Sequence, residues 1–347
     1  MGDGRGRQVV ALPLDVAVEL DEASILKSFG GKTSRALIDG FRDHRFRLAA
    51  TATPAPNDHM ELGQYAEFLG VMATNEMLSR WFINDTSTAS QEWRLKGHAV
   101  ADFWSWMASW ARMAEKPADL GDNSVSFDLP ALNVRRHRAA ETDMRDHGDG
   151  LFATLEMSAT KMHDVKRATS GARAAKLAEI VNADPGETWV IWCDTDYEAD
   201  AIKAAIPDAA EIRGSQSIEE KETRLADFAS GAVKRLITKP SLTGYGLNWQ
   251  HCARMAYVGR SFSYETWYQS VRRCWRFGQK RPVDVHLIVA EGEAEIGRVI
   301  ERKAADHADM KRAMREAMAA AQKTSEVKVP YRPTHKGRLP QWLKSAA

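Results

Sequence analysis

Short apolar runs recur along this chain, and helical patterning follows each of them. Five such runs are RLAATATP, TWVIWCDTD, KRLITKP, ARMAYVG and VDVHLIVA, at residues 47–54, 188–196, 234–240, 253–259 and 283–290. Short apolar runs that alternate with helical segments are typical of a parallel sheet covered by helices on both faces. Because four of the five lie in the second half of the chain, we predict an α/β fold whose more complete sheet is there.

Two stretches carry large apolar residues at helical spacing. The first lies within FWSWMASWARM at 103–113, and its members are Phe103, Trp106, Met107, Trp110 and Met113. The second belongs to a helical pattern that runs from Glu291 through Ala321, and its members are Met310, Met314 and Met318. Such spacing favours core packing over base stacking or a cofactor site, although tryptophan can stack on bases.

Polar stretches divide the chain further. The tract from Glu61 to Arg138 reads as helical and irregular, and the polar segment 138–150 predicts a junction between two halves. Two basic runs, RRHR at 135–138 and KRAMR at 311–315, fit either phosphate contacts or a solvated surface. The basic, proline-interrupted end after residue 325 is expected to be a poorly ordered tail that adds affinity for DNA.

Composition narrows the class of protein only a little. A chain of 347 residues with 44% apolar content is long enough for two domains. The 48 basic and 47 acidic side chains nearly cancel, so any nucleic-acid surface must come from local clusters. The three cysteines have no C-x-x-C spacing, which favours a reducing compartment and argues against structural zinc. Since Asp15 and Glu19 interrupt the apolar start, we expect a cytoplasmic protein without signal peptide or membrane anchor.

The stretch GGKTS at 30–34 has the form in which a phosphate-binding loop ends. A complete loop of that type needs a glycine five positions before its second glycine, where this chain has Leu26. The stretch also follows the acidic run LDEAS instead of a buried strand. We therefore interpret it as a polar loop in which Thr33 or Ser34 caps a helix. The inward-facing residues of that helix would be Leu37, Ile38 and Phe41.

Candidate catalytic residues in the first half are the adjacent carboxylates Asp21 and Glu22. At a strand end, one such carboxylate can hold Mg²⁺ through water while the other orients or deprotonates an attacking water. Solvated loop residues are the plain alternative for an acidic pair. Thr51 and Thr53 follow an apolar run, where their hydroxyls can connect a nucleotide site to a binding track, or merely form a strand-to-loop turn.

The second half carries the more specific pattern. Gly244 and Gly246 follow the apolar run RLIT and allow close backbone approach to a phosphate or sugar, or a tight turn. Farther on, Arg273 and Arg276 stand three positions apart in QSVRRCWRFGQKRPV, on one face if that segment is helical. A pair of guanidinium groups there can neutralise the charge on a transferring γ-phosphoryl group.

Taken in order, these segments resemble superfamily-two helicases. DEAS, TATPAPN, GYGLN and QSVRRCWRFGQKRPV occur in the order of motifs II, III, V and VI, and the form QxxxRxxRxGQ resembles the Swi/Snf-type signature. The segment EIRGSQSIEEKETRLADFASG at 211–231 is similar to the strand, Gly-Ser loop and helix that precede motif V in that family. The resemblance spans about residues 20–290 and is nearest to helicases of phages and prophages. It implies two RecA-like lobes of parallel sheet flanked by helices.

The resemblance also implies roles for residues. Asp21 would bind Mg²⁺, Glu22 would activate water, and Arg273 and Arg276 would be arginine fingers for ATP. Gly244, Gly246 and Gln269 would line the cleft that binds the nucleotide, while Thr51, Thr53 and Thr243 would couple it to double-stranded DNA. The expected cofactors are ATP and Mg²⁺. The expected activity is translocation along duplex DNA, rather than strand separation.

The sequence departs from the family at motif I. The family carries its GxxxxGK[ST] loop well upstream of the acidic pair, but only twenty residues precede Asp21, and no other G-K-[ST] occurs. We therefore expect homology to begin near Leu20, with residues 1–19 a remnant or the product of an alternative start or frameshift. The expected divisions are a partial first lobe at 20–160, a complete second lobe at 161–325 and a basic tail at 326–347.

This departure makes it uncertain whether the chain is an enzyme. Without the backbone N–H groups and lysine of that loop, the phosphates lose most of their donors, so we expect weak ATP hydrolysis or none. A partner segment that supplies motif I would restore it. The alternative is a non-catalytic module, derived from a helicase, that binds nucleic acid or a protein partner. An RNA helicase is disfavoured by the Arg-Phe-Gly-Gln ending of motif VI.

Overall fold

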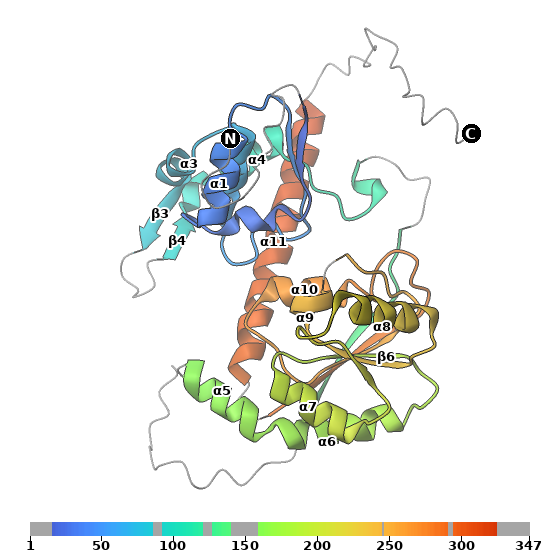
Figure 1. The fold of residues 1–347 in the computed structure, drawn as a ribbon. Coiled ribbons are helices and arrows are strands. Elements are labelled where there is room, and N and C mark those ends of the chain that lie inside the picture. Colours follow the sequence, from blue (N-terminus) through green and yellow to red (C-terminus); the bar gives the residue numbers. More distant parts are fainter. Residues whose placement is uncertain are drawn as a thin grey trace, which may run out of the picture.

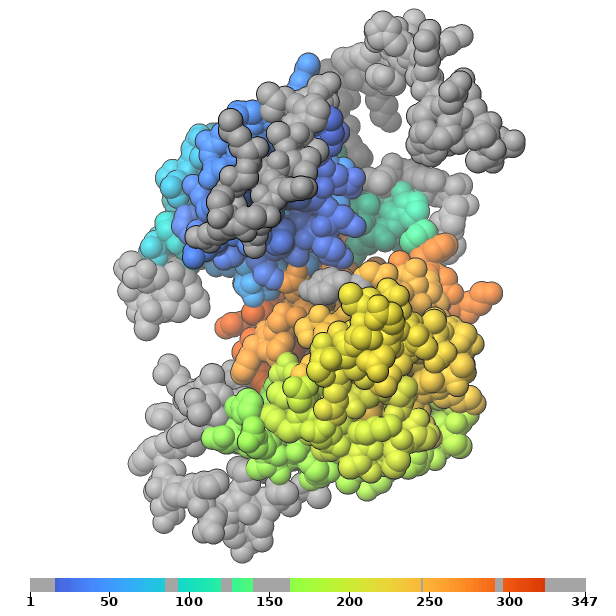
Figure 2. Space-filling view, in the orientation of Figure 1, coloured from blue at the N-terminus to red at the C-terminus, as the bar shows by residue number. Residues whose placement is uncertain are grey.

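A computed structural model describes residues 16–85, 92–120, 127–139, 159–244, 246–290 and 294–324. They form two lobes of helices and parallel strands, and the long helix α11 (Ala294–Thr324) runs from one lobe to the other (Figure 1). In Figure 2 the first lobe, coloured blue, lies above the green, yellow and orange second lobe. The predicted α/β class, with a parallel sheet flanked by helices, is confirmed.

The second lobe is built on a six-stranded sheet in the order β5-β10-β9-β6-β8-β7. All of its strand pairs are parallel. The strands are β5 (Leu132–Arg138), β6 (Trp189–Trp192), β7 (Ala210–Glu211), β8 (Arg235–Thr238), β9 (Arg254–Tyr257) and β10 (Val283–Val289). The four apolar runs of the second half thus become four adjacent strands, as the sequence predicts.

Helices cover both faces of this sheet. Central strand β6 is WVIW, and its alternate side chains enter two different cores: Trp189 and Ile191 pack on one face, Val190 and Trp192 on the other. Burial on both faces is why such a strand reads as an unbroken apolar run. The helices of this lobe are α5 (Ala159–Ala168), α6 (Ser170–Asn182), α7 (Asp196–Ala205), α8 (Ile218–Ser230), α9 (Pro240–Thr243) and α10 (Tyr264–Val271).

The segment 211–231 folds as its sequence predicts. It consists of the short strand β7, a loop and helix α8. The Ser217 side chain accepts the backbone N–H of Glu220, whose carboxylate accepts the N–H of Ser217, so a capping box begins the helix. Gly231 ends it in the left-handed region at φ 80°, which a glycine adopts without steric cost.

The first lobe has much less sheet. Strands β1 (Val18–Leu20) and β2 (Arg47–Ala49) form a parallel pair, and β3 (Phe82–Asp85) and β4 (Glu92–Leu95) form an antiparallel hairpin. Its α-helices are α1 (Lys32–Gly40), α2 (Leu62–Leu69), α3 (Thr74–Trp81) and α4 (Val100–Trp110). Its 3₁₀ turns are η1 (Ala23–Lys27), η2 (His59–Glu61), η3 (Gly97–Ala99) and η4 (Pro117–Leu120).

Two expectations for the first lobe need correction. Helix α1 begins after Gly31, and neither Thr33 nor Ser34 caps it. Instead the buried Ser34 hydroxyl donates to the carbonyl of Leu26 and lies 3.1 Å from the Gln64 side-chain oxygen, which joins α1 to η1 and α2. The prediction that residues 61–138 are helical and irregular also missed the β3–β4 hairpin, whose strands are only four residues long.

Helix α11 connects the two lobes. Near its start, Ile296 and Ile300 pack against Tyr264 of the second lobe. Farther along, the predicted methionine stripe packs against α4 of the first lobe, and its members are Met310, Met314 and Met318. Core packing is thereby confirmed both for this stripe and for the aromatic stripe of α4. The helix belongs to neither lobe alone.

The structure also shifts the limit between the lobes. The sequence places it at residue 160, whereas β5 pairs with β10 over its whole length and so adds residues 132–138 to the second sheet. A pairing between segments about 150 positions apart leaves no local signal, which is why the pattern missed it. The basic run at 135–138 is therefore part of a sheet edge, where Arg135 forms an ion pair with Asp284.

Some expectations fall outside the described residues. They concern residues 1–15, most of the polar junction at 138–150, Tyr245 and the tail after residue 324. Cys193, Cys252 and Cys274 are buried free thiols. Within the described ranges, no helix combines the length and apolar character that crossing a membrane requires.

Candidate functional site

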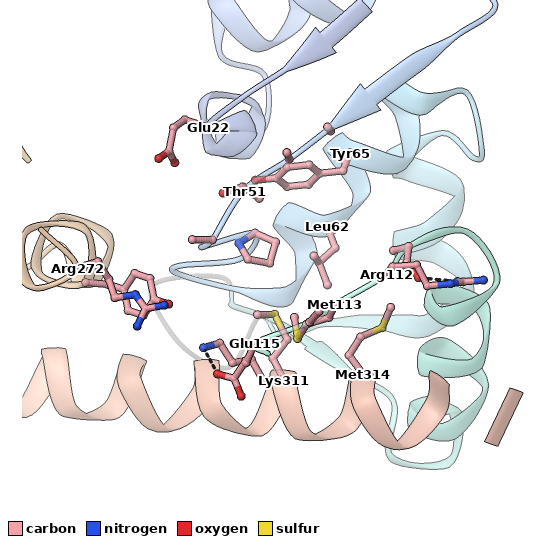
Figure 3. A pocket seen from close by; sticks show the side chains of 18 of the residues that line it. Glu22, Thr51, Leu62, Tyr65, Arg112, Met113, Glu115, Arg272, Lys311 and Met314 are labelled. Atoms are coloured by element: carbon pink, nitrogen blue, oxygen red, sulfur yellow. Dashed lines mark hydrogen bonds and ion pairs between the residues drawn. The ribbon is translucent and has the colours of Figure 1, made fainter. Parts of the chain in front are cut away.

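A cleft of about 1090 Å³ lies between the lobes. Glu22 and Thr51 line it from the first lobe, and Gln269, Arg273 and Arg276 line it from the second. Figure 3 shows Glu22 and Thr51 above, Arg272 to the left, and Lys311 and Met314 of α11 below. The cleft thus has one polar end and a large apolar region, which α2, α4 and α11 provide.

Glu22 is held in an unusual backbone conformation. It is the second residue after β1, with φ 52° and ψ 47°, and it is the only non-glycine residue with positive φ in the described part of the chain. Its N–H is bonded to the Asp21 carboxylate at 2.9 Å. Burial raises the pKa of the Glu22 carboxyl, as does Asp21, while Arg273 and Gln269 oppose the rise. Strained conformations of this kind cluster at functional sites, and a raised pKa suits a proton acceptor.

Gln269 connects the acidic and basic sides of the cleft. Its side-chain Nε2 donates to the Glu22 carboxylate at 3.0 Å, and its Oε1 accepts from Arg273 Nη2 at 3.1 Å. Arg273 donates also to the carbonyls of Gln269 and Leu247. Burial and the neighbouring Arg276 lower the pKa of Arg273, which Glu22 counteracts. The carboxylate and the guanidinium, 251 positions apart in the sequence (273 − 22), therefore face one site.

Arg276 takes a more open position beside the same loop. Its guanidinium donates to the carbonyl of Leu247 at 3.3 Å and to the side-chain oxygen of Asn248. Both arginines are thereby tied to the segment that follows α9. The predicted finger arginines lie side by side at the cleft, with Arg273 buried and Arg276 half-buried.

The two predicted coupling threonines occupy different environments. Thr51 lines the cleft, and its hydroxyl accepts the N–H of Thr53 at 3.1 Å. Thr53 is buried, and its hydroxyl lies 3.4 Å from the carboxylate of Glu265 on α10. Glu265 also forms an ion pair with Lys27 of η1. The loop after β2 is therefore joined to the second lobe through Glu265.

The residues of the glycine turn lie apart from this group. Thr243 is buried, and its hydroxyl donates to that of Thr238 at 3.1 Å. A side chain on Gly244 would approach the Pro240 carbonyl oxygen to 2.3 Å, and Gly246 has φ 72°, so both positions require glycine for local reasons. None of the three residues lines the cleft. The next two residues, Leu247 and Asn248, are connected to the cleft through their bonds to the arginines.

Asp21 is exposed on the turn before Glu22 and does not line the cleft. The described residues contain no group of three or more histidine, cysteine or carboxylate side chains that could hold a metal ion. Mg²⁺ in phosphate sites commonly uses one or two carboxylates together with substrate oxygens and water. A magnesium role for Asp21 is compatible with this arrangement and stays a prediction.

Sequence reasoning missed Lys27 and Glu265. Glu265 stands one helical turn before Gln269, so Glu265, Gln269 and Arg273 follow one another at i, i+4 and i+8. An acidic residue at that spacing, ahead of a basic motif, was a usable signal. The apolar wall of the cleft was also missed, because the sequence pattern assigned Trp110, Met310 and Met314 to core packing and did not single out Trp104.

Replacing Glu265 by glutamine is expected to loosen the contact between the lobes. Glu265 is almost fully buried and its loss of charge removes the ion pair with Lys27, at a cost of about 1–3 kcal/mol. Hydrogen exchange of the amides in η1 and α10 should then become about tenfold faster. The matched control is Glu67→Gln, because Glu67 pairs with Arg35 inside the first lobe. Equal protection of α10 in both variants would contradict the bridging role.

Comparisons with known proteins add little to this geometry. No protein-family model matches the sequence, and no curated protein matches it. Among solved structures, the C-terminal part of the Fun30 ATPase domain is similar with a TM-score of 0.34 and 15% identity. The match covers 37% of this chain and 45% of that one, so the chain spans less than half of that structure.

Proposed function

We propose that this chain is a helicase-like DNA translocase module of the Swi/Snf type, with its nucleotide site at the polar end of the cleft. The observation that supports it best is the link through Gln269, which bonds both Glu22 and Arg273 across the two lobes. A triphosphate in the cleft would be held by Arg273 and Arg276 of the second lobe and, through a bound Mg²⁺, by the acidic side of the first lobe. Binding could then change the angle between them.

In this proposal each side chain has a distinct task. Glu22 orients or deprotonates the attacking water, and its raised pKa favours that role. Arg273 and Arg276 stabilise the charge of the transferring phosphoryl group. Asp21 would hold Mg²⁺, which supplies charge neutralisation when bound. Thr53 and Glu265 transmit closure of the cleft to the surface that binds duplex DNA.

The weak point of this site is phosphate binding. The printed sequence contains no GxxxxGK[ST] loop, and Ser34 of the GGKTS stretch is buried in a structural contact. Arg273 already donates from Nε, Nη1 and Nη2 to protein oxygens, which leaves it fewer donors for the β-phosphate. We therefore propose that efficient hydrolysis requires a segment supplied by a partner, and that this chain alone hydrolyses ATP weakly or not at all.

Steady-state phosphate release, with and without duplex DNA, tests this expectation. We expect rates near background for the unaltered chain and for Glu22→Gln alike. The control Glu19→Gln changes an exposed carboxylate on β1, outside the cleft. Turnover that Glu22→Gln abolishes and Glu19→Gln preserves would instead make this chain a complete motor.

A non-catalytic module that binds nucleic acid or a protein is the second candidate, and the missing loop favours it. The two candidates differ in coupling. If the site binds nucleotide, a non-hydrolysable ATP analogue with Mg²⁺ should change the affinity for duplex DNA, and Arg273→Ala should remove that change. DNA affinity that is indifferent to the analogue would reject the translocase module in favour of the second candidate.

A further inference from the structure

The first lobe's parallel sheet has an open edge at β2. Val18 N–H donates to the Phe46 carbonyl, and Ala50 N–H donates to the Leu20 carbonyl. Because backbone groups alternate in direction along a strand, Arg47 and Ala49 direct their N–H and C=O groups away from β1. Within the described residues, β2 has no strand on that second side. Such an edge is a template for another strand.

This open edge borders the cleft. Residues 48–52, which include the end of β2, line the cleft, and so do residues 111–114 after helix α4. Ala111 has φ −103° and ψ 154°, so this second segment begins in an extended conformation. Figure 3 shows Thr51 and Tyr65 above and Met113 below. An extended chain that entered here would have backbone on two sides.

The surrounding surface is apolar, with polar atoms that lack partners. Its apolar residues are Leu48, Leu62, Tyr65, Leu69, Trp110 and Met314. Tyr65 is only 5% exposed, yet its hydroxyl has no hydrogen-bond partner, and neither does Trp110 Nε1. Buried polar groups are nearly always paired in folded proteins. Both side chains line the cleft, but their two polar atoms are buried below its surface, so the groove offers an occupant mainly apolar contacts.

We propose that this groove accepts an apolar, extended strand of another polypeptide, which pairs parallel to β2. Backbone groups of the strand would meet those of Arg47 and Ala49, and its apolar side chains would cover the groove. A mostly apolar small molecule would leave the edge groups unpaired, so a polypeptide is the better fit. Leu48, which is 55% exposed, adds apolar surface beside the same edge.

A parallel strand would place its carboxyl end beside Glu22 and Thr51, because β1 and β2 end there. Residues just after that strand could supply the backbone N–H groups that phosphate binding lacks in this chain. The best occupant is therefore an apolar strand followed by a glycine-rich loop with a lysine. This role of the loop rests on the proposed function, whereas the docking of the strand does not.

Peptide binding to the full chain, without nucleotide, tests the docking. The probe is a fluorescein-labelled peptide of alternating valine and isoleucine that ends in Gly-Ser-Gly-Lys-Thr. Its control is the same peptide with every amide of the valine–isoleucine segment N-methylated, so that no register leaves an N–H for β2. We expect saturable binding by fluorescence anisotropy, slower hydrogen exchange at the amides of Arg47 and Ala49, and binding at least about tenfold weaker for the N-methylated peptide.

Two proline variants test which edge of the two-stranded sheet binds the peptide. Ala49→Pro removes an outward N–H on the open edge of β2 and should weaken peptide binding about tenfold. Glu19→Pro removes the corresponding outward N–H on the far edge of β1 and should leave binding unchanged. Circular dichroism checks that both variants fold. If either does not fold, the comparison of the two peptides on the unaltered chain still decides.

Three results would overturn the proposal: no saturable binding, equal binding of the N-methylated peptide, or unchanged exchange at Arg47 and Ala49. Self-association of the chain that Ala49→Pro abolishes would also overturn it, because a second copy would then occupy the edge. Peptide binding without phosphate release would leave the groove in place and reject only the catalytic role of the loop. Phosphate release that needs no peptide would reject the requirement for a partner.

Discussion

Replacing Arg173 by alanine is expected to lower the free energy of unfolding by about 3–5 kcal/mol. The Arg173 guanidinium lies 2.9 Å from the Glu198 carboxylate, and both side chains are fully buried between α6 and α7. Arg173 also donates to the carbonyl of Lys166. Removing the cation leaves a buried carboxylate that has no other ion pair among the described residues, which is far more costly than losing a surface pair.

The carboxylate cannot simply move away when its partner is lost. Glu198 accepts the N–H groups of Asp194 and Thr195 at 2.9 and 3.0 Å, which begins helix α7 at the carboxyl end of β6. Urea denaturation followed by tryptophan fluorescence measures the loss. The control is Lys176→Ala. Because Lys176 forms an exposed ion pair with Glu179, its replacement should change the free energy of unfolding by less than about 1 kcal/mol. A change below about 1 kcal/mol for Arg173→Ala would contradict this account.

The second large effect is a loss of stability on acidification, from about pH 6.5 downwards. Burial and the neighbours His137 and Arg135 lower the pKa of His286 to about 4. Burial and Lys311 lower the pKa of His307 to about 4. In the unfolded chain both would bind protons near the ordinary histidine pKa of about 6.5. Unfolding is thus coupled to proton uptake between these values.

The direction of the pH effect follows from the difference between the histidine pKa values of the folded and unfolded chain. The stabilising contribution is complete above pH 6.5 and decreases as the pH falls toward 4, because only the unfolded chain takes up the protons. Each histidine should account for about 3 kcal/mol by pH 4. Urea midpoints from pH 7.5 to 4.5 measure the slope, which the double variant His286→Gln, His307→Gln should flatten. The control is His98→Gln, because His98 is exposed and its replacement should leave the slope of stability against pH unchanged. An unchanged slope in the double variant would refute the assignment to His286 and His307.

The strands of the second lobe could be predicted because their signal is local. Each of β6, β8, β9 and β10 is an apolar run bounded by polar or turn residues, and burial on both faces requires that composition. Strand β5 escaped because LNVRRHR is basic and lies at the sheet edge, where only one partner is needed. The hairpin of the first lobe escaped because two four-residue strands are too short to show a period.

The candidate site could be predicted in its residues but only partly in its contacts. The acidic pair and the two arginines stand out by type and spacing, and the structure brings Glu22, Gln269 and Arg273 into one cleft. The glycine turn lies outside that cleft, since its residues pack within their own lobe. The Lys27–Glu265 pair could not be foreseen, because an ion pair between lobes depends on how the lobes dock.

The sequence by itself determined the α/β class, the strands of the second lobe and the packing role of the methionine and aromatic stripes. These depend on periodicities over a few residues, which local burial imposes. Only the tertiary structure decided that β5 joins the second sheet, that α11 spans both lobes and that β2 has an open edge beside an apolar cleft. Such features depend on pairings between distant segments, whose free energy arises only when the whole chain has assembled.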